Sequence, residues 1–282
     1  MNILTIDVED WFHILDNKST KTVKEWSKYE PRIHKNMERI FNILDKVNTK
    51  ATFFVLGWIA EKYPNVVKEI NNRGYEIGSH TTYHQLVYEQ NKNEFFNDVN
   101  RSIKTIEDIT GEKVKMFRAP GFSITEKNKW AFKILYELGI EFDSSIFPAS
   151  RAHGGFPSYG SAKPSILRYN GVTLKEFPIN TYNIMGQSLI YSGGGYFRLT
   201  PYKLIKKWTN NANYVMAYIH PRDLDPNQPV IKELSIFRKF KSYVGLQSAE
   251  SKLEKWLADF DFIDVTTANK KMDWNKIKKI NI

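Results

Sequence analysis

The strongest constraint on the fold is a regular alternation, along the chain, of short continuously apolar runs with longer segments of helical periodicity. The predicted strands lie at 3–8, 51–56, 75–78, 115–118, 142–147, 174–178, 214–219 and 262–266, and the predicted helices at 34–46, 59–72, 93–110, 125–138 and 248–260. Strands that are apolar throughout are typical of parallel sheets covered by helices. The alternation therefore predicts an α/β fold whose parallel strands, about seven in number, form a closed or nearly closed barrel.

The domain organisation follows from length and from the absence of a linker. A chain of 282 residues with a hydrophobic fraction of 41% suits either one α/β barrel or two smaller domains. It contains no internal repeat, low-complexity tract or linker, so a single domain over 1–282 is expected. The stretches 148–165 and 180–195 are irregular. Loops of this length are uncommon in compact domains without a functional reason, so both are predicted to line or cover a site.

Charge and cysteine content restrict the partners and the chemistry. The chain has 41 Lys and Arg against 31 Asp and Glu, a net charge of +10, and no Cys. The lysines are scattered, which indicates a solvated basic surface rather than a nucleic-acid interface, and no nucleic-acid partner is expected. Without cysteine there are no disulfides, thiolate metal sites or Cys nucleophiles, so any metal must use His and carboxylate ligands.

The two ends of the chain bear on its location. A carboxylate at Asp7 interrupts the first apolar run before an export signal core forms, and the longest apolar run, 51–60, is short of the ~20 residues that span a bilayer. A cytoplasmic protein is expected. The tail 270–282 interleaves five lysines with Trp and Ile, which predicts either peripheral contact with an anionic inner membrane surface or a frayed terminus.

Polar residues gather where the predicted strands end. They are Asp7, Glu9 and Asp10 after the first strand, His80 and His84 after the third, Arg118 after the fourth, Asp143 in the fifth, and His220 after the strand at 214–219. The carboxyl ends of parallel strands meet at one edge of a barrel, and catalytic groups gather there. We therefore expect these side chains to lie close together.

His80 and His84 are candidate metal ligands. They lie four residues apart, so one helical turn would place both imidazoles on the same face. Two His and one carboxylate suit a borderline-soft divalent ion and leave positions open for water and substrate. The carboxylate comes from the acidic cluster after the first strand. Glu9, on the same strand face as Asp7, is favoured over Asp10, which needs a bulge or turn to reach the ion.

Three further residues complete a candidate catalytic set. Arg118 can hold the carboxylate of Asp7 ionised and oriented through its fixed guanidinium fork. His220 is a candidate proton donor, because imidazole titrates near neutrality. An acid, a base and a metal site together indicate hydrolysis.

Five segments in this order resemble the motifs of the polysaccharide deacetylase family, also called the NodB-homology or carbohydrate esterase family 4 proteins. They are TIDVED at 5–10, HTTYH at 80–84, RAPGF at 118–122, DSS at 143–145 and YIHP at 218–221. The resemblance spans residues 1 to about 225, which form the motif-bearing core, and 226–282 are expected to pack on it as a C-terminal extension. From residue 193 onward the chain is similar to a bacterial branch linked to exopolysaccharide and lipopolysaccharide gene clusters.

The resemblance implies a distorted (β/α) barrel and metal-dependent removal of an N-acetyl group from an amino sugar. It gives Asp7 as the catalytic base, His80 and His84 as metal ligands, Arg118 as the residue that orients the base, His220 as the general acid and Asp143 as the residue that tunes it; backbone amides of Gly121 and Phe122 would hold the oxyanion. Zinc is the first expectation for the metal, with Co, Ni, Mn or Fe as alternatives. The family's usual first motif has two adjacent aspartates, whereas Val8 and Glu9 separate Asp7 from Asp10 here.

The expected substrate is an acetamido-sugar, with a phosphate-bearing or lipid-linked precursor as one form of it. Phe156, Tyr159, Tyr191, Tyr196 and Phe197 are candidate sugar-stacking residues that also fit a core. Residues 193–195 lack the Lys-Ser/Thr of a phosphate loop and are predicted to form a close-packed turn. The alternatives are hydrolysis of a formamide or cyclic amide, a non-haem Fe(II) oxygenase, which shares the two-His-one-carboxylate set, and a catalytically silent sugar-binding relative.

Overall fold

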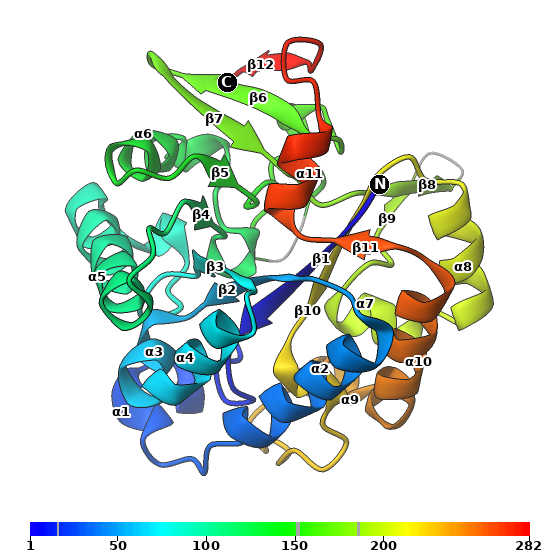
Figure 1. Ribbon diagram of the computed structural model, residues 1–282. Coiled ribbons are helices and arrows are strands. Elements are labelled where there is room, and N and C mark those ends of the chain that lie inside the picture. Colours follow the sequence, from blue (N-terminus) through cyan, green and yellow to red (C-terminus); the bar gives the residue numbers. More distant parts are fainter. Residues whose placement is uncertain (16, 151–152, 185–186) are drawn as a thin grey trace.

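A long, mainly parallel sheet organises the chain (Figure 1). The computed structural model describes residues 1–15, 17–150, 153–184 and 187–282. Seven strands pair in parallel, one after another: β10 (Val215–Ile219), β1 (Asn2–Val8), β2 (Thr52–Val55), β3 (Glu76–Ser79), β4 (Met116–Phe117), β5 (Phe142–Asp143) and β7 (Val172–Glu176). The prediction of a parallel α/β fold is therefore confirmed. The sheet is an open version of the barrel. In the described part of the chain, β10 at one edge of the sheet does not pair with β12 at the opposite edge.

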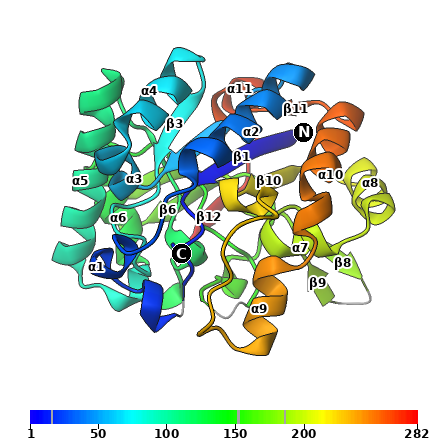
Figure 2. The same ribbon diagram turned by 90° about the horizontal axis from the view of Figure 1, so that it is seen from below.

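Helices surround the strands, as Figures 1 and 2 show. The main ones are α2 (Ile33–Val47), α3 (Gly57–Lys62), α4 (Pro64–Asn72), α5 (Lys92–Thr110), α6 (Trp130–Glu137) and α10 (Leu246–Asp259). Their positions agree with the predicted helices except in two cases. The segment predicted as one helix at 125–138 is a 3-10 helix at Glu126–Asn128 followed by α6. The segment predicted as a single helix at 59–72 is two helices that break before Pro64, because proline has no amide hydrogen and its ring clashes with the preceding turn.

The sequence prediction missed strand β6 (Ser165–Tyr169), which pairs antiparallel with β7. The two strands are joined by Asn170 and Gly171, whose φ angles are 44° and 83°. Asn-Gly is the pair that a tight hairpin with two left-handed residues favours, so the signal was present in the sequence. Of the irregular stretch 148–165, the described part holds one short 3-10 helix, η5 (Pro157–Tyr159).

The remaining elements are short and were not predicted, apart from β11. They are α1 (Val23–Trp26), β8 (Tyr182–Ile184), β9 (Gln187–Leu189), α7 (Gly194–Leu199), α8 (Tyr202–Asn210), α9 (Ile236–Tyr243), β11 (Phe262–Ile263), α11 (Val265–Lys271) and β12 (Lys279–Asn281), with 3-10 turns at η1 (Lys18–Thr20), η2 (Val87–Glu89), η3 (Pro120–Phe122), η4 (Glu126–Asn128) and η6 (Pro221–Leu224). The strand predicted at 262–266 ends early because Asp264 caps α11, accepting a hydrogen bond from the amide of Thr267 at 2.6 Å.

The C-terminal residues are built into the sheet. β11 pairs in parallel with β1, and β12 pairs in parallel with β6. Ile280 in β12 is buried. This pairing contradicts the alternative of a frayed terminus, whereas peripheral contact of the tail with an anionic membrane surface stays a prediction. None of the described helices has the length and apolar composition needed to cross a membrane.

The two faces of β1 explain how the fold positions its polar residues. Leu4, Ile6 and Val8 face the helices and join the larger apolar core, whereas Ile3 joins a smaller core inside the curved sheet with residues such as Phe54 and Met216. Successive side chains of a strand point to opposite faces, so Asp7 shares the inner face with Ile3. The inner face thus changes from apolar to ionisable at the carboxyl end of the strand.

Candidate active site

Asp7 and Arg118 form a buried ion pair at the carboxyl ends of β1 and β4. Nη1 of Arg118 donates to Oδ1 of Asp7 at 2.7 Å and is also 2.7 Å from Oγ1 of Thr5. The other side of the guanidinium donates to the carbonyl and hydroxyl oxygens of Ser144, and its face lies 4.4 Å from the ring centroid of Phe54. With all its nitrogens engaged and no exposed surface, Arg118 holds one oxygen of Asp7 in a fixed place.

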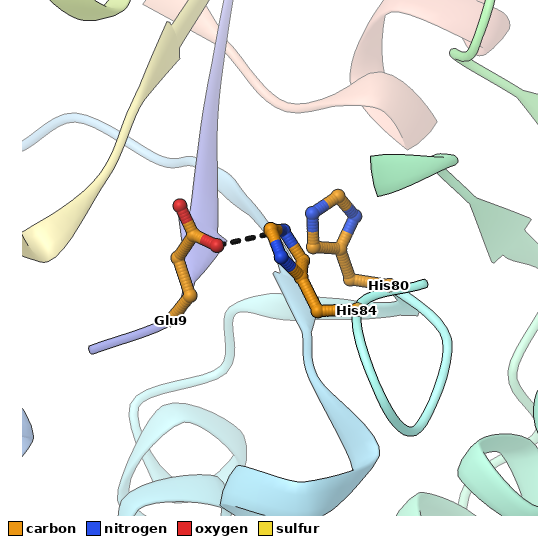
Figure 3. Close-up of side chains that lie close together, drawn as sticks. All are labelled: Glu9, His80 and His84. Carbon is orange, nitrogen blue, oxygen red and sulfur yellow. Dashed lines mark ion pairs between the residues drawn. The ribbon is translucent and has the colours of Figure 1, made fainter. Parts of the chain in front are cut away.

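Glu9, His80 and His84 bring three ligand atoms together beside this pair. The atoms all lie within 4.8 Å of one another, and Nε2 of His84 is 2.7 Å from Oε2 of Glu9 (Figure 3). All three side chains are buried. A carboxylate oxygen and two imidazole nitrogens at this spacing fit the donor set of a divalent ion such as zinc, with coordination positions left for water and substrate.

The loop that carries the two histidines is not the helical turn that their spacing indicated. Residues 80–84 follow β3 as an irregular segment, and both Thr81 and His84 have positive φ, at 65° and 54°. Asp98 on α5 holds this loop, because its Oδ1 accepts hydrogen bonds from the amides of Thr82 and Tyr83, each at 3.1 Å. The imidazole rings of His80 and His84 still come within 5.3 Å of each other, so the proximity is achieved by a different backbone path.

The protonation states in the cluster suit metal binding. Nδ1 of His80 lies 2.7 Å from the carbonyl oxygen of Arg118, and since a carbonyl only accepts, Nδ1 carries the proton and Nε2 keeps its lone pair. Burial lowers the pKa of His80 to about 4, which keeps this ring neutral. Burial also works to raise the pKa of Glu9, but His84, His220 and His80 outweigh it and leave that pKa well below its usual range.

Asp10, the alternative ligand, faces away from the histidines. Its Oδ1 accepts from the amide of Trp11 at 2.7 Å, and its Oδ2 accepts from the amides of Arg32 and Ile33, at 2.8 and 3.1 Å, where α2 begins. Among the described residues, Asp10 is not part of the cluster. Both of its oxygens are used to anchor the start of α2, where a helix favours negative charge.

His220 faces the cluster from the end of β10. Its Nε2 is 3.4 Å from Oε1 of Glu9 and 3.9 Å from Oδ2 of Asp7. Its Nδ1 is 2.8 Å from Oδ2 of Asp223, whose Oδ1 is in turn 3.1 Å from Nε of Arg198. Burial alone would lower the pKa of His220, but the carboxylates of Asp223, Glu9 and Asp7 outweigh it and raise this pKa to about 9. The ring is therefore protonated at neutral pH.

Asp223 occupies the place that the sequence analysis assigned to Asp143. Asp143 contacts Ser145 and Glu176 instead of His220: the hydroxyl of Ser145 donates to it at 2.7 Å and accepts from the amide of Ala119. Asp143 therefore supports the loop that follows Arg118. Asp223 was missed, although its position three residues after His220, with Pro221 between them, is the spacing of a helix-start capping pair.

The two residues expected to bind an oxyanion lie in the turn after β4. The amide of Phe122 donates to the carbonyl of Ala119 at 3.1 Å and closes that turn. Gly121, with φ of 60°, lines the same cleft as Asp7 and His220. Of the two backbone amides, that of Gly121 is the one to consider as a donor to substrate.

The site opens into a cleft of about 400 Å³. It is lined by Asp7, Glu9, His80, His84 and His220, and further out by residues of α7 and α9. Of the five candidate sugar-stacking residues, Tyr196 is 42% exposed and lines the cleft, while the other four are buried in the core. The prediction of close packing at 193–195 is confirmed, since a Cβ at Gly193 would lie 2.3 Å from the carbonyl oxygen of Tyr218, but the segment begins helix α7 and is not a turn.

His13 also lines the cleft and was not predicted. Its ring is buried against Trp26 and Trp58, and its centroid lies 6.3 Å from that of His84. Nδ1 accepts the amide of Asp10 at 2.8 Å, and Nε2 has no hydrogen-bond partner among the described residues. The sequence did offer a signal for this residue, because His13 lies three residues after the acidic Asp10. It was not identified, since no helix or strand was predicted for this segment.

Comparisons with known proteins agree with this geometry. Residues 25–142 match the family described as "Polysaccharide deacetylase", and residues 144–270 match one described as "Domain of unknown function (DUF3473)". The first match contains His80, His84 and Arg118, and the second contains His220 and Asp223.

Curated relatives are similar to part of this chain. A peptidoglycan-N-acetylglucosamine deacetylase of Bacillus cereus is 42% identical over 93 residues, which are 32% of this chain and 34% of that protein. One from Listeria monocytogenes is 33% identical over 81 residues, 29% of this chain and 17% of that protein. The matched stretches thus span about a third or less of these two relatives.

Solved structures share the fold. A protein of Mycobacterium smegmatis, provisionally described as a polysaccharide deacetylase, superposes with a TM-score of 0.66 at 18% identity, over 100% of this chain and 92% of its own. A carbohydrate esterase family 4 pseudoenzyme of Bacillus anthracis gives 0.51 at 14% identity, over 100% of this chain and 69% of its own. At these identities the likeness concerns the fold.

Proposed function

Residues 25–142 of this chain match the polysaccharide deacetylase family, and from this premise we propose that the protein hydrolyses the N-acetyl group of an amino sugar with the help of a divalent metal ion. The observation that carries the proposal is the cleft in which a restrained carboxylate, Asp7, and a protonated imidazole, His220, flank the cluster of Glu9, His80 and His84. Such a set has a use in hydrolysis, which needs both a base and an acid.

The metal would be held by Glu9, His80 and His84, with zinc as the first candidate and Co, Ni, Mn or Fe as alternatives. The single carboxylate and two imidazoles suit a borderline-soft ion, and the neutral His80 and ionised Glu9 are the forms that bind one. When bound, the ion would supply Lewis acidity toward the acetyl carbonyl oxygen and water.

The residues around the cluster divide the proton transfers between them. Asp7, held by Arg118 through one oxygen, takes a proton from water with the other as the water oxygen forms a bond to the carbonyl carbon. The C–N bond then breaks, and His220 donates its proton to the departing sugar nitrogen. The amide of Gly121 donates a hydrogen bond to the carbonyl oxygen as negative charge develops there. Acetate and a free amino sugar result.

We further propose that the substrate is an acetamido-sugar of a bacterial surface glycan or its precursor, in a phosphate-bearing or lipid-linked form, and that the protein acts in the cytoplasm at the inner membrane. The net charge of +10 supports an anionic substrate or surface. Cell fractionation tests the location, and comparing free, phosphorylated and lipid-linked acetamido-sugars tests the substrate form.

The central experiment measures acetate release from acetamido-sugars with metal-loaded protein, with chelator, and with the variants Asp7→Asn and His220→Ala. Each variant is expected to lose about 10²- to 10⁴-fold in turnover while keeping the metal, because each removes one proton transfer. His34→Ala, at an exposed histidine on α2, is the matched control and should be unchanged. Turnover near the native rate in either variant refutes the assignment, and release of formate from formamides in place of acetate identifies another C–N hydrolase.

A further inference from the structure

Helix α9 carries an exposed apolar face beside the cleft. Ile236, Phe237 and Phe240 are 88%, 65% and 53% exposed, and the helix, every residue of which the structure describes, has no buried side chain. Ile236 and Phe240 are four residues apart and Phe237 and Phe240 are three apart, so the three lie on one side of the helix. Exposing two Phe and one Ile to water on a short helix is unfavourable, since apolar surface is more stable out of contact with water.

The apolar face continues onto α7 and into the cleft. Leu199, 55% exposed, and Tyr196 line the cleft together with Phe237 and Phe240. Arg198 ties the two helices together, because its guanidinium donates to the carbonyl oxygens of Ser242 and Val244 at 2.9 and 3.0 Å. We call Tyr196, Leu199, Ile236, Phe237 and Phe240 the mouth patch. A partner that covers this patch lies directly over the entrance to the site.

The segments that carry the mouth patch contribute basic residues and no acidic ones. α9 contains Arg238, Lys239 and Lys241, and the segment 196–210 contains Arg198, Lys203, Lys206 and Lys207. Arg198 is buried beside Asp223 and Lys206 pairs with Asp259, so the positive surface charge comes mainly from Lys203, Lys207, Lys239 and Lys241. Nζ of Lys241 lies 4.4 Å from the ring centroid of Phe237, so cation and aromatic surface adjoin on the same helix. A surface complementary to this patch is therefore negatively charged and accepts apolar groups.

An anionic lipid bilayer has both properties. A short basic helix with aromatic side chains on one side rests in the interface with those side chains among the headgroups and upper acyl chains, and each nearby Lys or Arg is attracted to a negative surface. α9 also lies at the edge of the molecule in Figure 2, where a flat surface could reach it. We propose that α9 and the mouth patch dock on an anionic membrane surface.

This location differs from the basic tail expected from the sequence. The tail ends in β12, near the top of Figure 1, whereas α9 lies in its lower half. The carboxyl end of β1, which carries Asp7, points to that lower half as well. Docking through α9 thus turns the entrance of the cleft toward the bilayer.

The absence of cysteine makes a direct test simple. A single Ile236→Cys variant, labelled with an environment-sensitive dye, is mixed with vesicles of phosphatidylcholine alone or of phosphatidylcholine with phosphatidylglycerol. The emission is expected to shift to the blue with the anionic vesicles, weakly with the neutral ones, and less as salt is added. The same dye on Tyr136→Cys, at a 52% exposed position on α6, should not shift.

A second measurement separates docking from general attraction by charge. Phe237→Glu/Phe240→Glu should lose vesicle co-sedimentation by on the order of tenfold or more, whereas Tyr136→Glu should sediment as the native protein does. Circular dichroism melts check that both variants fold. The proposal is overturned if the dye emission at residue 236 does not shift with anionic vesicles, or if the emission at residue 136 shifts equally. It is also overturned if the double variant co-sediments with vesicles as the native protein does, or if only a protein partner shields the dye. Because no substrate is present, the outcome is independent of the proposed deacetylation.

Discussion

His220 depends on Asp223 for the proton that the proposed mechanism uses. The two side chains are 2.8 Å apart, and Asp223 is the foremost of the carboxylates that raise the pKa of His220 to about 9. A residue that acts as an acid must be protonated, so activity should fall as pH rises through that pKa. Asp223 is thus a positioning residue, because it acts through His220.

We predict that Asp223→Asn moves the basic limb of the kcat/KM profile to lower pH by about 1 unit, because it removes a negative charge that favours protonated His220. The loss of activity should then be larger at pH 9 than at pH 6. Asp261→Asn, at an exposed aspartate, is the control. A uniform loss at every pH would mean that Asp223 has only a structural role.

Asp98 offers a separate test of the loop that carries the histidines. Burial raises its pKa to about 6, against hydrogen bonds that lower it, so the folded protein binds this proton more tightly than the unfolded chain does. Stability from this group is therefore present at low pH and is lost as pH rises from about 4 to about 6. The penalty above pH 6 is at most about 3 kcal/mol.

We predict that Asp98→Asn, which keeps the Oδ1 acceptor for the amides of Thr82 and Tyr83, is as stable as the native protein or more so at pH 7.5, and that its advantage shrinks toward pH 4.5. Urea unfolding at the two pH values measures this. Asp98→Ala removes the acceptor and should be destabilised by about 1–3 kcal/mol at both. An advantage of the Asn variant that grows as pH falls would contradict the assignment.

Among the elements, α5 matters because it carries Asp98 and so supports the loop at 80–84. It begins with a capping box, in which Asn91 accepts the amide of Glu94 at 3.0 Å and Glu94 accepts the amide of Asn91 at 2.8 Å. Gly111 ends the helix with φ of 73°. These end signals are local, which is why the sequence located this helix closely.

Asn91→Ala should therefore lower the free energy of unfolding by about 1 kcal/mol, because it leaves an amide of the first turn without its acceptor. Asn93→Ala, at an exposed position two residues on, removes the same side chain without removing a cap and serves as the control. Equal effects of the two substitutions in urea unfolding would contradict the capping role.

Elements with strong local signals could be predicted, and those defined by tertiary contacts could not. The apolar strands located Asp7, His80, Arg118 and His220 at the ends of β1, β3, β4 and β10, because parallel pairing brings those ends to one edge. The strand β12 has no such pattern, because it exists through its pairing with β6. The helix α9 has an apolar face, but it spans only eight residues and buries none of them, and the sequence analysis did not identify it.

Within the site, residue types were predictable but hydrogen-bond partners were not. Which of Glu9 and Asp10 turns toward the histidines depends on how the backbone leaves β1, where the amide of Glu9 donates to the carbonyl of Asp7. Likewise, the partner of His220 is fixed by the turn after β10 and not by a distant strand. Each of these arrangements depends on one or two hydrogen bonds, which do not produce a periodic pattern in the sequence.

At the scale of the whole molecule, metal binding should increase the free energy of unfolding. An ion that binds the folded chain and not the unfolded one adds about 2.7 kcal/mol when its concentration is 100 times its dissociation constant, which raises the melting temperature by several degrees. We predict this rise for zinc added back to chelator-treated protein. It should vanish in Glu9→Gln and His84→Ala and persist in Asp10→Asn. Persistence in the first two variants, or loss in the third, would contradict the ligand assignment.

The Arg198 contacts join distant parts of the molecule. One guanidinium both neutralises Asp223, the partner of His220, and holds the carbonyl oxygens at the end of α9. A displacement of α9 would therefore move the guanidinium of Arg198 relative to Asp223. Such a movement would change how strongly Asp223 favours the proton on His220. Contact at the surface helix is in this way coupled to the acid of the proposed reaction.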